Sequence, residues 1–159
     1  MAHITTDQVW QEVEKQLFAV LGMVTASGEA RTAGIVYVVH QRKLYISSLK
    51  TAWKIRHIRA NPSVSLTIPI HKQIPLLPWI KIPAATITFS GRARILEPSD
   101  LPPEVVKPLF RGMTISPETS PPFAVIEVTP AGDFITYGVG VPLLTMRDPQ
   151  KARGRVAVA

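Results

Sequence analysis

The chain has 159 residues, the usual size of a single domain, and its apolar content of 46% favours a folded core over disorder. It contains no cysteine, which excludes disulfides, thiolate nucleophiles and cysteine-based metal sites. No apolar run approaches the ~20 residues that span a bilayer, and the polar N-terminus is neither a secretion signal nor a transit peptide, so a cytoplasmic protein is expected.

The net charge of +7 is unevenly distributed along the chain. Residues 30–96 contain none of the eleven acidic residues but eleven of the eighteen lysines and arginines. This segregation favours an anionic partner: a phosphate-bearing small molecule, a nucleic acid or an acidic membrane surface. A site in this half has no carboxylate that could serve as a general base or bind a hard metal ion, so any chemistry must come from elsewhere.

The first third of the chain predicts one helix followed by three strands. The helix covers about residues 6–16, with Thr6 or Asp7 as its cap. Apolar side chains recur there at helical spacing, at Val9, Trp10, Val13 and Leu17. A strand over residues 18–25 ends at a Ser–Gly turn, and residues 31–48 predict a hairpin because its first arm is rich in β-branched residues.

The middle of the chain alternates regular and irregular segments. A helix is predicted over residues 51–60, ended by the pair Asn61–Pro62. Two strands with one polar face follow over residues 63–70 and 85–95, because apolar and polar residues alternate there with a period of two. Between them, prolines forbid a regular element in an apolar loop, residues 71–83.

The last third predicts a short proline-interrupted helix over residues 101–112, strands over 123–128 and 134–137 with a turn between them, and an irregular, basic tail over 138–159. No internal repeat or second domain is visible. Six or seven short strands and few helices predict a small, mainly β barrel over about residues 17–137, within a single domain of residues 1–159.

The segment from Leu44 to Asn61 is the strongest candidate site. A strand that ends in two hydroxyl residues, Ser47 and Ser48, turns into a helix whose first turn contains Thr51 and Lys54. Helix N-termini attract phosphate because they present unpaired amides and a partial positive charge; the hydroxyls add donors and the lysine a full charge. The alternative is that Ser48 or Thr51 only caps the helix and the lysines are solvated.

Other interpretations carry less weight. A basic stripe over residues 50–59 could follow a nucleic acid backbone, but aromatic platforms for bases are few, so nucleic acid is disfavoured. The four histidines lack ligand spacing and nearby acids, so no metal site is predicted, and no hydrolase motif is present. The apolar loop over residues 74–83 needs a cover: a second subunit is the first choice, then a cofactor lid, then a membrane surface.

Taken together, these features resemble the pyridoxamine-phosphate-oxidase-like, FMN-binding split-barrel family over about residues 17–137. The resemblance depends on the order and spacing of loose motifs, and no single motif is diagnostic. The motifs are the strands 17–25 and 31–39, Leu44-Tyr45-Ile46-Ser47-Ser48 with Lys54 six residues on, Asn61-Pro62-Ser63-Val64-Ser65-Leu66, Phe89-Ser90-Gly91-Arg92-Ala93-Arg94, and Val125-Ile126-Glu127-Val128-Thr129-Pro130.

The resemblance implies a six-stranded antiparallel split barrel that forms a homodimer, with two cofactor sites built across the subunit interface. FMN is the favoured cofactor, and deazaflavin, FAD and haem are the alternatives found among relatives. Lys54 would bind the phosphate, Ser47 and Ser48 would lie near it, and Thr86 would reach the flavin of the other subunit. The second strand would face the flavin ring and ribityl chain, partly through backbone groups, with Arg31, Thr32, Ala33, Gly34 and Ile35.

Three departures from the family pattern shape the functional prediction. Pyridoxamine-phosphate oxidases proper tend to have Ser-Arg-Lys where this chain has Ala52-Trp53-Lys54, so one phosphate-binding cation is missing, and Lys50 and Arg56 are candidates to replace it. Their C-terminal substrate-binding Trp and Arg motifs have no clear match in residues 138–159. The apolar loop over residues 71–83 is also longer than the family's short version. Vitamin B6 oxidation is therefore disfavoured.

The resulting prediction is a flavin-dependent oxidoreductase that moves a hydride or electrons between a reductant and a small apolar or anionic substrate. No catalytic residue is assigned, because hydride transfer needs no protein base in principle. One alternative is a non-catalytic carrier of a flavin, deazaflavin or haem on the same fold. The other is a basic module with an empty barrel that binds nucleic acid.

Overall fold

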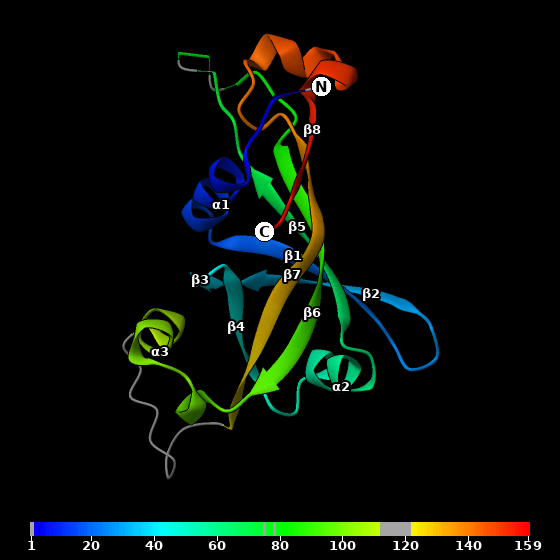
Figure 1. Ribbon diagram of the computed structural model, residues 1–159, viewed down its shortest axis with the longest axis vertical. Coiled ribbons are helices and arrows are strands. Elements are labelled where there is room, and N and C mark those ends of the chain that lie inside the picture. Colours follow the sequence, from blue (N-terminus) through cyan, green and yellow to red (C-terminus); the bar gives the residue numbers. More distant parts are fainter. Residues whose placement is uncertain (1, 75, 78, 112–121) are drawn as a thin grey trace.

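The computed structural model describes residues 2–74, 76–77, 79–111 and 122–159. Within these residues, eight strands form one antiparallel sheet, and helices lie around it (Figure 1). The strands are β1 (Phe18–Val24), β2 (Ala30–Val36), β3 (Val38–His40), β4 (Lys43–Leu49), β5 (Ser63–Ile70), β6 (Ala85–Leu96), β7 (Phe123–Tyr137) and β8 (Arg153–Ala157). The helices are α1 (Thr6–Lys15), α2 (Trp53–Ala60), α3 (Pro103–Phe110) and α4 (Pro149–Ala152), with the 3-10 helices η1 (Pro98–Asp100) and η2 (Leu143–Arg147).

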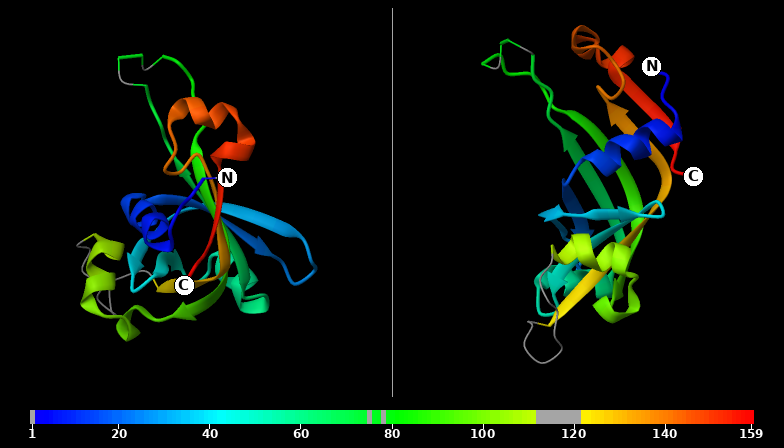
Figure 2. Two further views of the ribbon diagram at one scale, coloured as in Figure 1. Left: turned by 45° about the horizontal axis from the view of Figure 1, so that its top comes forward. Right: turned by 90° about the vertical axis from the view of Figure 1, so that its left-hand side faces the viewer.

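The sheet curls into a barrel because its two edge strands are consecutive along the chain. The strand order is β2-β1-β5-β6-β7-β4-β3, with β8 added to β7, and only Tyr37 separates β2 from β3. The chain therefore joins the two edges, and the sheet wraps around a single core (Figure 2). The predicted mainly β, antiparallel split-barrel class is confirmed, with eight strands in the described residues where six were expected.

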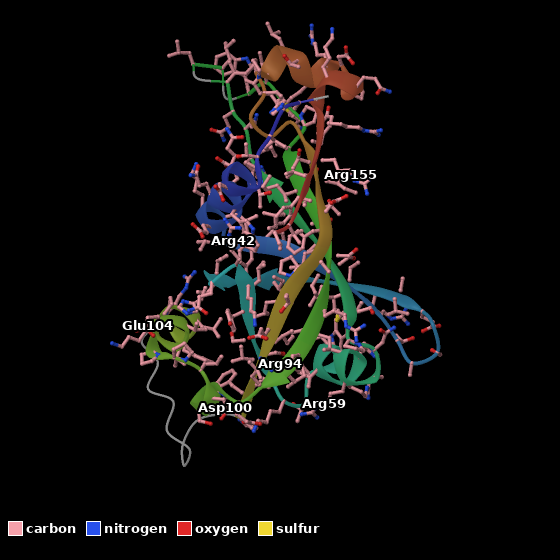
Figure 3. The ribbon with its side chains drawn as sticks, in the orientation of Figure 1. Arg42, Arg59, Arg94, Asp100, Glu104 and Arg155 are labelled. Carbon is pink, nitrogen blue, oxygen red and sulfur yellow. The ribbon has the colours of Figure 1, made fainter. Side chains whose placement is uncertain are left out.

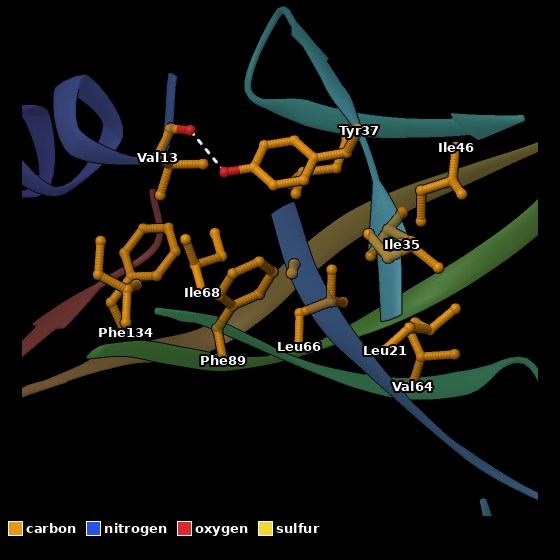
Figure 4. Packing of buried hydrophobic residues seen from close by; sticks show 14 of the residues in the cluster. Val13, Leu21, Ile35, Tyr37, Ile46, Val64, Leu66, Ile68, Phe89 and Phe134 are labelled. Carbon is orange, nitrogen blue, oxygen red and sulfur yellow. Dashed lines mark hydrogen bonds between the residues drawn. The ribbon is translucent and has the colours of Figure 1, made fainter. Parts of the chain in front are cut away.

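Two predictions about the strands need correction. The predicted hairpin forms only between β3 and β4, and β2 pairs with β1 instead. The first arm of the predicted hairpin breaks at Tyr37, because the Tyr37 amide donates to the Leu17 carbonyl and its buried hydroxyl donates to the Val13 carbonyl at 2.7 Å (Figure 4). The turn predicted at residues 130–133 does not form. Strand β7 continues through it because β6 pairs with both halves of β7, with a register shift between Thr88 and Ser90.

Alternating apolar side chains fill the barrel, and α1 and α2 pack against this core. The ring of Phe134 lies edge-on to the rings of Trp10 and Phe89, at centroid distances of 5.4 and 5.3 Å. Helix α1 buries Val9, Trp10 and Val13, and helix α2 buries Ile55 and Ile58. Because both helices contribute to the same core, the position of α2 is fixed relative to the strands.

Helix α1 has a different cap from the one that the sequence predicted. Thr5, not Thr6 or Asp7, is the N-cap: its hydroxyl accepts from the Gln8 amide at 3.3 Å, and the Gln8 side chain accepts from the Thr5 amide at 2.9 Å. This reciprocal capping box satisfies two unpaired amides at once. The helix ends at Lys15, so Leu17 lies outside it with 60% of its surface exposed.

The C-terminal region packs on the barrel and is not an irregular tail. After Gly138 the chain forms η2, α4 and then β8, which pairs with β7. The N-terminal segment also holds it, because the Ala2 amide donates to the Arg153 carbonyl at 2.7 Å and the Trp10 indole donates to the Val158 carbonyl at 3.1 Å. Sequence reasoning missed β8 because its Arg-Gly-Arg-Val-Ala sequence has little intrinsic strand propensity.

The connection between β5 and β6 contains no helix or strand in its described residues, as predicted. It lies at the same end of the molecule as η2 and α4, beyond the barrel (Figures 1 and 2). The short helix α3 lies in the predicted segment but ends at Phe110, and residue 112 of that prediction falls outside the described residues.

Candidate functional site

The predicted phosphate site forms one continuous strand–turn–helix. Strand β4 carries Ser47 and Ser48, and the chain turns through residues 50–52 into α2. Two backbone hydrogen bonds fix this turn: the Lys50 amide donates to the Pro122 carbonyl at 2.8 Å, and the Ala52 amide donates to the Leu49 carbonyl at 2.9 Å. The four residues predicted here, including Thr51 and Lys54, are therefore close neighbours along an ordered backbone.

The N-terminus of α2 has no side-chain cap. Its N-cap is Ala52, and the first turn contains no acidic residue, so the alternative interpretation, in which Ser48 or Thr51 caps the helix, does not hold. Ser48 is buried, and its hydroxyl lies 3.4 Å from the Leu49 carbonyl, a long hydrogen bond. The first amides of α2 consequently have no side-chain acceptor among the described residues, which is the state of a helix end that can receive an anion.

Lys54 is half-buried in the first turn of α2 and has no salt-bridge partner among the described residues. Of the two candidates for the missing second cation, Lys50 is already engaged, since its ammonium lies 2.6 Å from a carboxylate oxygen of Glu97. Arg56 instead faces a shallow pocket of about 330 Å³ between α2 and the β1–β2 turn, which Arg31 and His57 also line. Arg31 pairs there with Glu29 at 2.8 Å.

Strand β2 presents the predicted flavin-contacting residues in two different ways. Among the described strands, β2 pairs only with β1, so the backbone N–H and C=O groups along its other edge pair with no described strand. Thr32 and Gly34 are exposed, and Ala33 is half-buried against the core. Ile35 is buried in the core, so its side chain cannot contact a ligand outside the barrel and only its backbone can.

A groove of about 530 Å³ crosses the outer face of the sheet. Its floor is a row of small residues at matching register positions on five strands: Thr32, Gly22, Ser65, Ser90 and Ala131. A Cβ on Gly22 would lie 2.6 Å from the Ser65 hydroxyl oxygen, so this row is tightly packed between strands. Sequence reasoning named Thr32 but missed the row, because register between strands is not visible in the sequence.

A second pocket joins Ser47 to residues far from it in sequence. This pocket of about 330 Å³ lies between the β2–β3 junction, β4 and α3. Its apolar walls include Val36, Tyr37 and Leu109, and Arg111 provides a cation at its edge. Arg111 follows α3 in a left-handed conformation with φ of 46°, and nothing in the sequence marked it as a pocket residue.

Thr86 does not join the other predicted residues within one chain. It lies at the start of β6, opposite Pro69 and Tyr137, and is half-buried. Arg92, at the α2 end of the same strand, is six residues away, which corresponds to about 20 Å along a strand. Arg59 and Arg94 also lie toward that α2 end (Figure 3). A cofactor held at α2 would therefore need Thr86 from a second copy.

A buried carboxylate forms a network that sequence reasoning missed. Glu127 accepts hydrogen bonds from the Tyr45 hydroxyl at 3.0 Å and from Arg94 at 2.9 Å, and the Lys43 ammonium lies at 3.5 Å. Burial, together with the bond to Glu127, raises the pKa of Tyr45 to about 12. Tyr45 also packs in a small apolar cluster with Val105 and Phe110 of α3, so this one side chain connects the network to the packing of α3 on the sheet.

The described part of the chain contains neither clustered metal-ligating side chains nor a long apolar helix. No group of three or more histidines, aspartates or glutamates is placed there to hold a metal ion. No helix in the described ranges is long and apolar enough to cross a membrane.

Comparison with known proteins places this arrangement in a family. The model of the pyridoxamine 5'-phosphate oxidase family matches residues 5–132. No curated protein matches the chain. The match includes every residue predicted to contact a cofactor, from Arg31 to Thr86.

Solved structures share the fold at low sequence identity. The chain is similar to a putative pyridoxamine 5'-phosphate oxidase from Listeria innocua, with 21% identity, a TM-score of 0.60 and coverage of 79% of this chain and 92% of the other. It is similar to a haem-binding protein from Mycobacterium smegmatis, with 13% identity, a TM-score of 0.67 and coverage of 99% and 60%. It is also similar to HutZ, the haem storage protein from Vibrio cholerae, with 14% identity, a TM-score of 0.59 and coverage of 86% and 98%. With the family match over most of its length, this chain belongs to the pyridoxamine 5'-phosphate oxidase family.

Proposed function

We propose that this chain binds FMN and acts as a flavin-dependent oxidoreductase on a small apolar or anionic molecule. The observation that carries the proposal is the N-terminus of α2, where Ala52 leaves the first amides without a side-chain cap and Lys54 adds a positive charge. A phosphate group satisfies both features at once, because it accepts several hydrogen bonds and carries negative charge. Membership of the family supports FMN as the ligand that brings this phosphate.

The residues of the chain divide the binding of this ligand between them. Lys54 would pair with the phosphate, and the amides of Trp53 and Lys54 would donate to its oxygens. Ser47 and Thr51 would add neutral donors from either side of the turn. The unpaired edge of β2 would present main-chain groups to the ring, and Arg31 would lie at the strand's outer end. When bound, FMN supplies the hydride- or electron-accepting ring, so the acid-free stretch around it needs no general base.

The site would be completed by a second copy of the chain, as a homodimer. Thr86 lies on the outer face of the sheet, too far along β6 to reach α2 of its own chain. That face carries the row of small residues described above and, around it, the exposed apolar side chains of Phe18, Val36 and Ile135. We infer that a two-fold axis through this face would bring each Thr86 toward the α2 end of the other copy.

A non-catalytic haem carrier is the second candidate function. It is favoured by the coverage of 99% of this chain by the Mycobacterium smegmatis structure, which includes the C-terminal elements that the family match leaves out. His57 belongs to α2, the helix of the candidate site, and lines the pocket between α2 and the β1–β2 turn. A neutral imidazole at this position could ligate haem iron.

The visible spectrum of the purified chain separates these functions. A flavin band that a nicotinamide donor reduces supports the enzyme, whereas a flavin band that no donor reduces supports a carrier. A Soret band identifies haem. A colourless protein that takes up no added FMN refutes the cofactor proposal. Light scattering of the FMN-bound protein tests the homodimer, and a monomer that retains FMN contradicts the shared site.

A further inference from the structure

An apolar pocket of about 250 Å³ lies at the end of the barrel opposite to α2, and none of the residues proposed to contact FMN lines it. It is formed by the loop between β5 and β6 on one side and by η2 on the other, and Figure 2 shows both segments at the same end of the barrel. Its apolar lining includes Ile74, Ile80, Ile82, Leu143 and Met146. The charged residues of the lining are two cations, Lys81 and Arg147.

Several hydrogen bonds hold the two walls of this pocket in place. The Lys72 ammonium donates to the carbonyls of Gly138 and Val141 at 2.5 and 3.1 Å, which ties the loop to the segment before η2. The Tyr137 hydroxyl donates to the Met146 carbonyl at 2.6 Å. A Cβ on Gly138 would lie 2.6 Å from the Met146 methyl group, so this glycine, at φ of 70°, makes room for the methionine at the pocket floor. The pocket is therefore built into the fold.

The chemistry of the lining defines what the pocket can take. An apolar cavity of this size does not hold ordered water well, because water needs two to four polar partners. The lining is aliphatic, and both charged groups are cations that make no salt bridge within the described ranges. An occupant with an apolar body and one anionic end satisfies both features, because burial favours the body and charge pairing favours the head group.

A second copy of the same chain is a poor occupant. This end of the molecule also carries three further cations, Lys72, Lys151 and Arg153. The nearby acid Asp148 is already paired, since its carboxylate lies 3.2 Å from the Lys151 ammonium. A two-fold contact through this end would bring the same cations together. Pockets for drug-sized ligands usually exceed about 300 Å³, so the volume of this pocket suits a smaller molecule.

We propose that the pocket between the β5–β6 loop and η2 is a binding site for a small amphiphilic carboxylate. The apolar part would lie against Ile82, Leu143 and Met146, and the carboxylate would pair with Lys81 and Arg147. This site is formed by one chain and needs neither FMN nor a second subunit. Its existence is consequently independent of the function proposed above.

The test is calorimetric titration of the purified full chain with octanoate, with octanol as the uncharged probe of the same length. Octanoate is expected to bind one site per chain, at least about tenfold more tightly than octanol. Exchanging both cations, Lys81→Gln with Arg147→Gln, should remove this preference. Lys151→Gln is the matched control, since this cation lies at the same end without lining the pocket.

Three results would overturn the proposal. The first is no saturable octanoate binding, and the second is equal binding of octanoate and octanol. The third is sedimentation of the protein with vesicles of phosphatidylglycerol without binding of free octanoate, which would identify this end as a membrane-contacting surface. Thermal unfolding of the double variant checks its folding, and the substitution Met146→Gln provides an independent test, because it should weaken octanol and octanoate equally.

Discussion

Replacing Ala52 with aspartate should change stability and cofactor binding in opposite directions. Ala52 is the N-cap of α2, with φ of −64° and ψ of 141°, a conformation that a capping residue adopts. An aspartate there would accept hydrogen bonds from the uncapped amides and should stabilise the fold by ~0.5–2 kcal/mol. For a chain of this size, each kcal/mol corresponds to roughly 2–4 °C in melting temperature.

The same carboxylate would occupy the amides proposed for the phosphate and would repel it. Repulsion between unit charges about 6 Å apart is worth ~1–3 kcal/mol at the effective dielectric of a protein surface, or roughly 5- to 150-fold in Kd. Ala52→Ser is the matched control, because serine caps the helix without adding charge. It should stabilise the fold while weakening FMN binding much less than aspartate does.

The assay combines thermal unfolding of the protein without FMN and titration with FMN followed by flavin fluorescence. The diagnostic result is a higher melting temperature with a weaker Kd for Ala52→Asp. If Ala52→Asp binds FMN as tightly as the unmodified chain does, the phosphate does not bind at this helix end. If neither variant is more stable, the end of α2 does not behave as an uncapped helix terminus.

Three further predictions follow from the same structure. Lys54→Ala should weaken FMN binding by ~1–3 kcal/mol through the loss of a charge-assisted contact. The control Arg59→Ala removes an exposed cation from the other end of α2 and should leave the Kd for FMN unchanged, and equal Kd values for the original chain and both variants would exclude Lys54 from the site. Gly91→Ala should lower the free energy of unfolding by ~1–3 kcal/mol in urea titrations, because its Cβ would lie 2.8 Å from the Thr129 carbonyl oxygen, and an unchanged midpoint would contradict this packing. Burial and Glu127 raise the pKa of Tyr45 from 10.0 to about 12, so the contribution of protonated Tyr45 to the free energy of unfolding should be full below pH 10 and decline as the pH rises toward 12. Tyr45→Phe should flatten this decline, and identical pH profiles of unfolding for the two proteins would argue against the buried bond.

The sequence by itself determined the class of fold and those local elements whose signals lie within a few neighbouring residues. Period-two alternation located β5 and β6, and the Asn61–Pro62 pair correctly ended α2, because these patterns act over a few neighbouring residues. The strand–turn–helix with Ser47, Ser48, Thr51 and Lys54 was predictable for the same reason: its residues are contiguous, so their proximity needs no tertiary information.

The tertiary structure decided everything that depends on pairing between distant segments. Strand β8 exists because β7 offers it a partner, and the continuous β7 exists because β6 pairs across the expected turn. Ile35 points into the core, and the Glu127 network forms, because strand register assigns each side chain to a face of the sheet. The empty cap of α2 also appeared only in three dimensions, because several nearby hydroxyls could have capped the helix and the backbone placed Ala52 there instead.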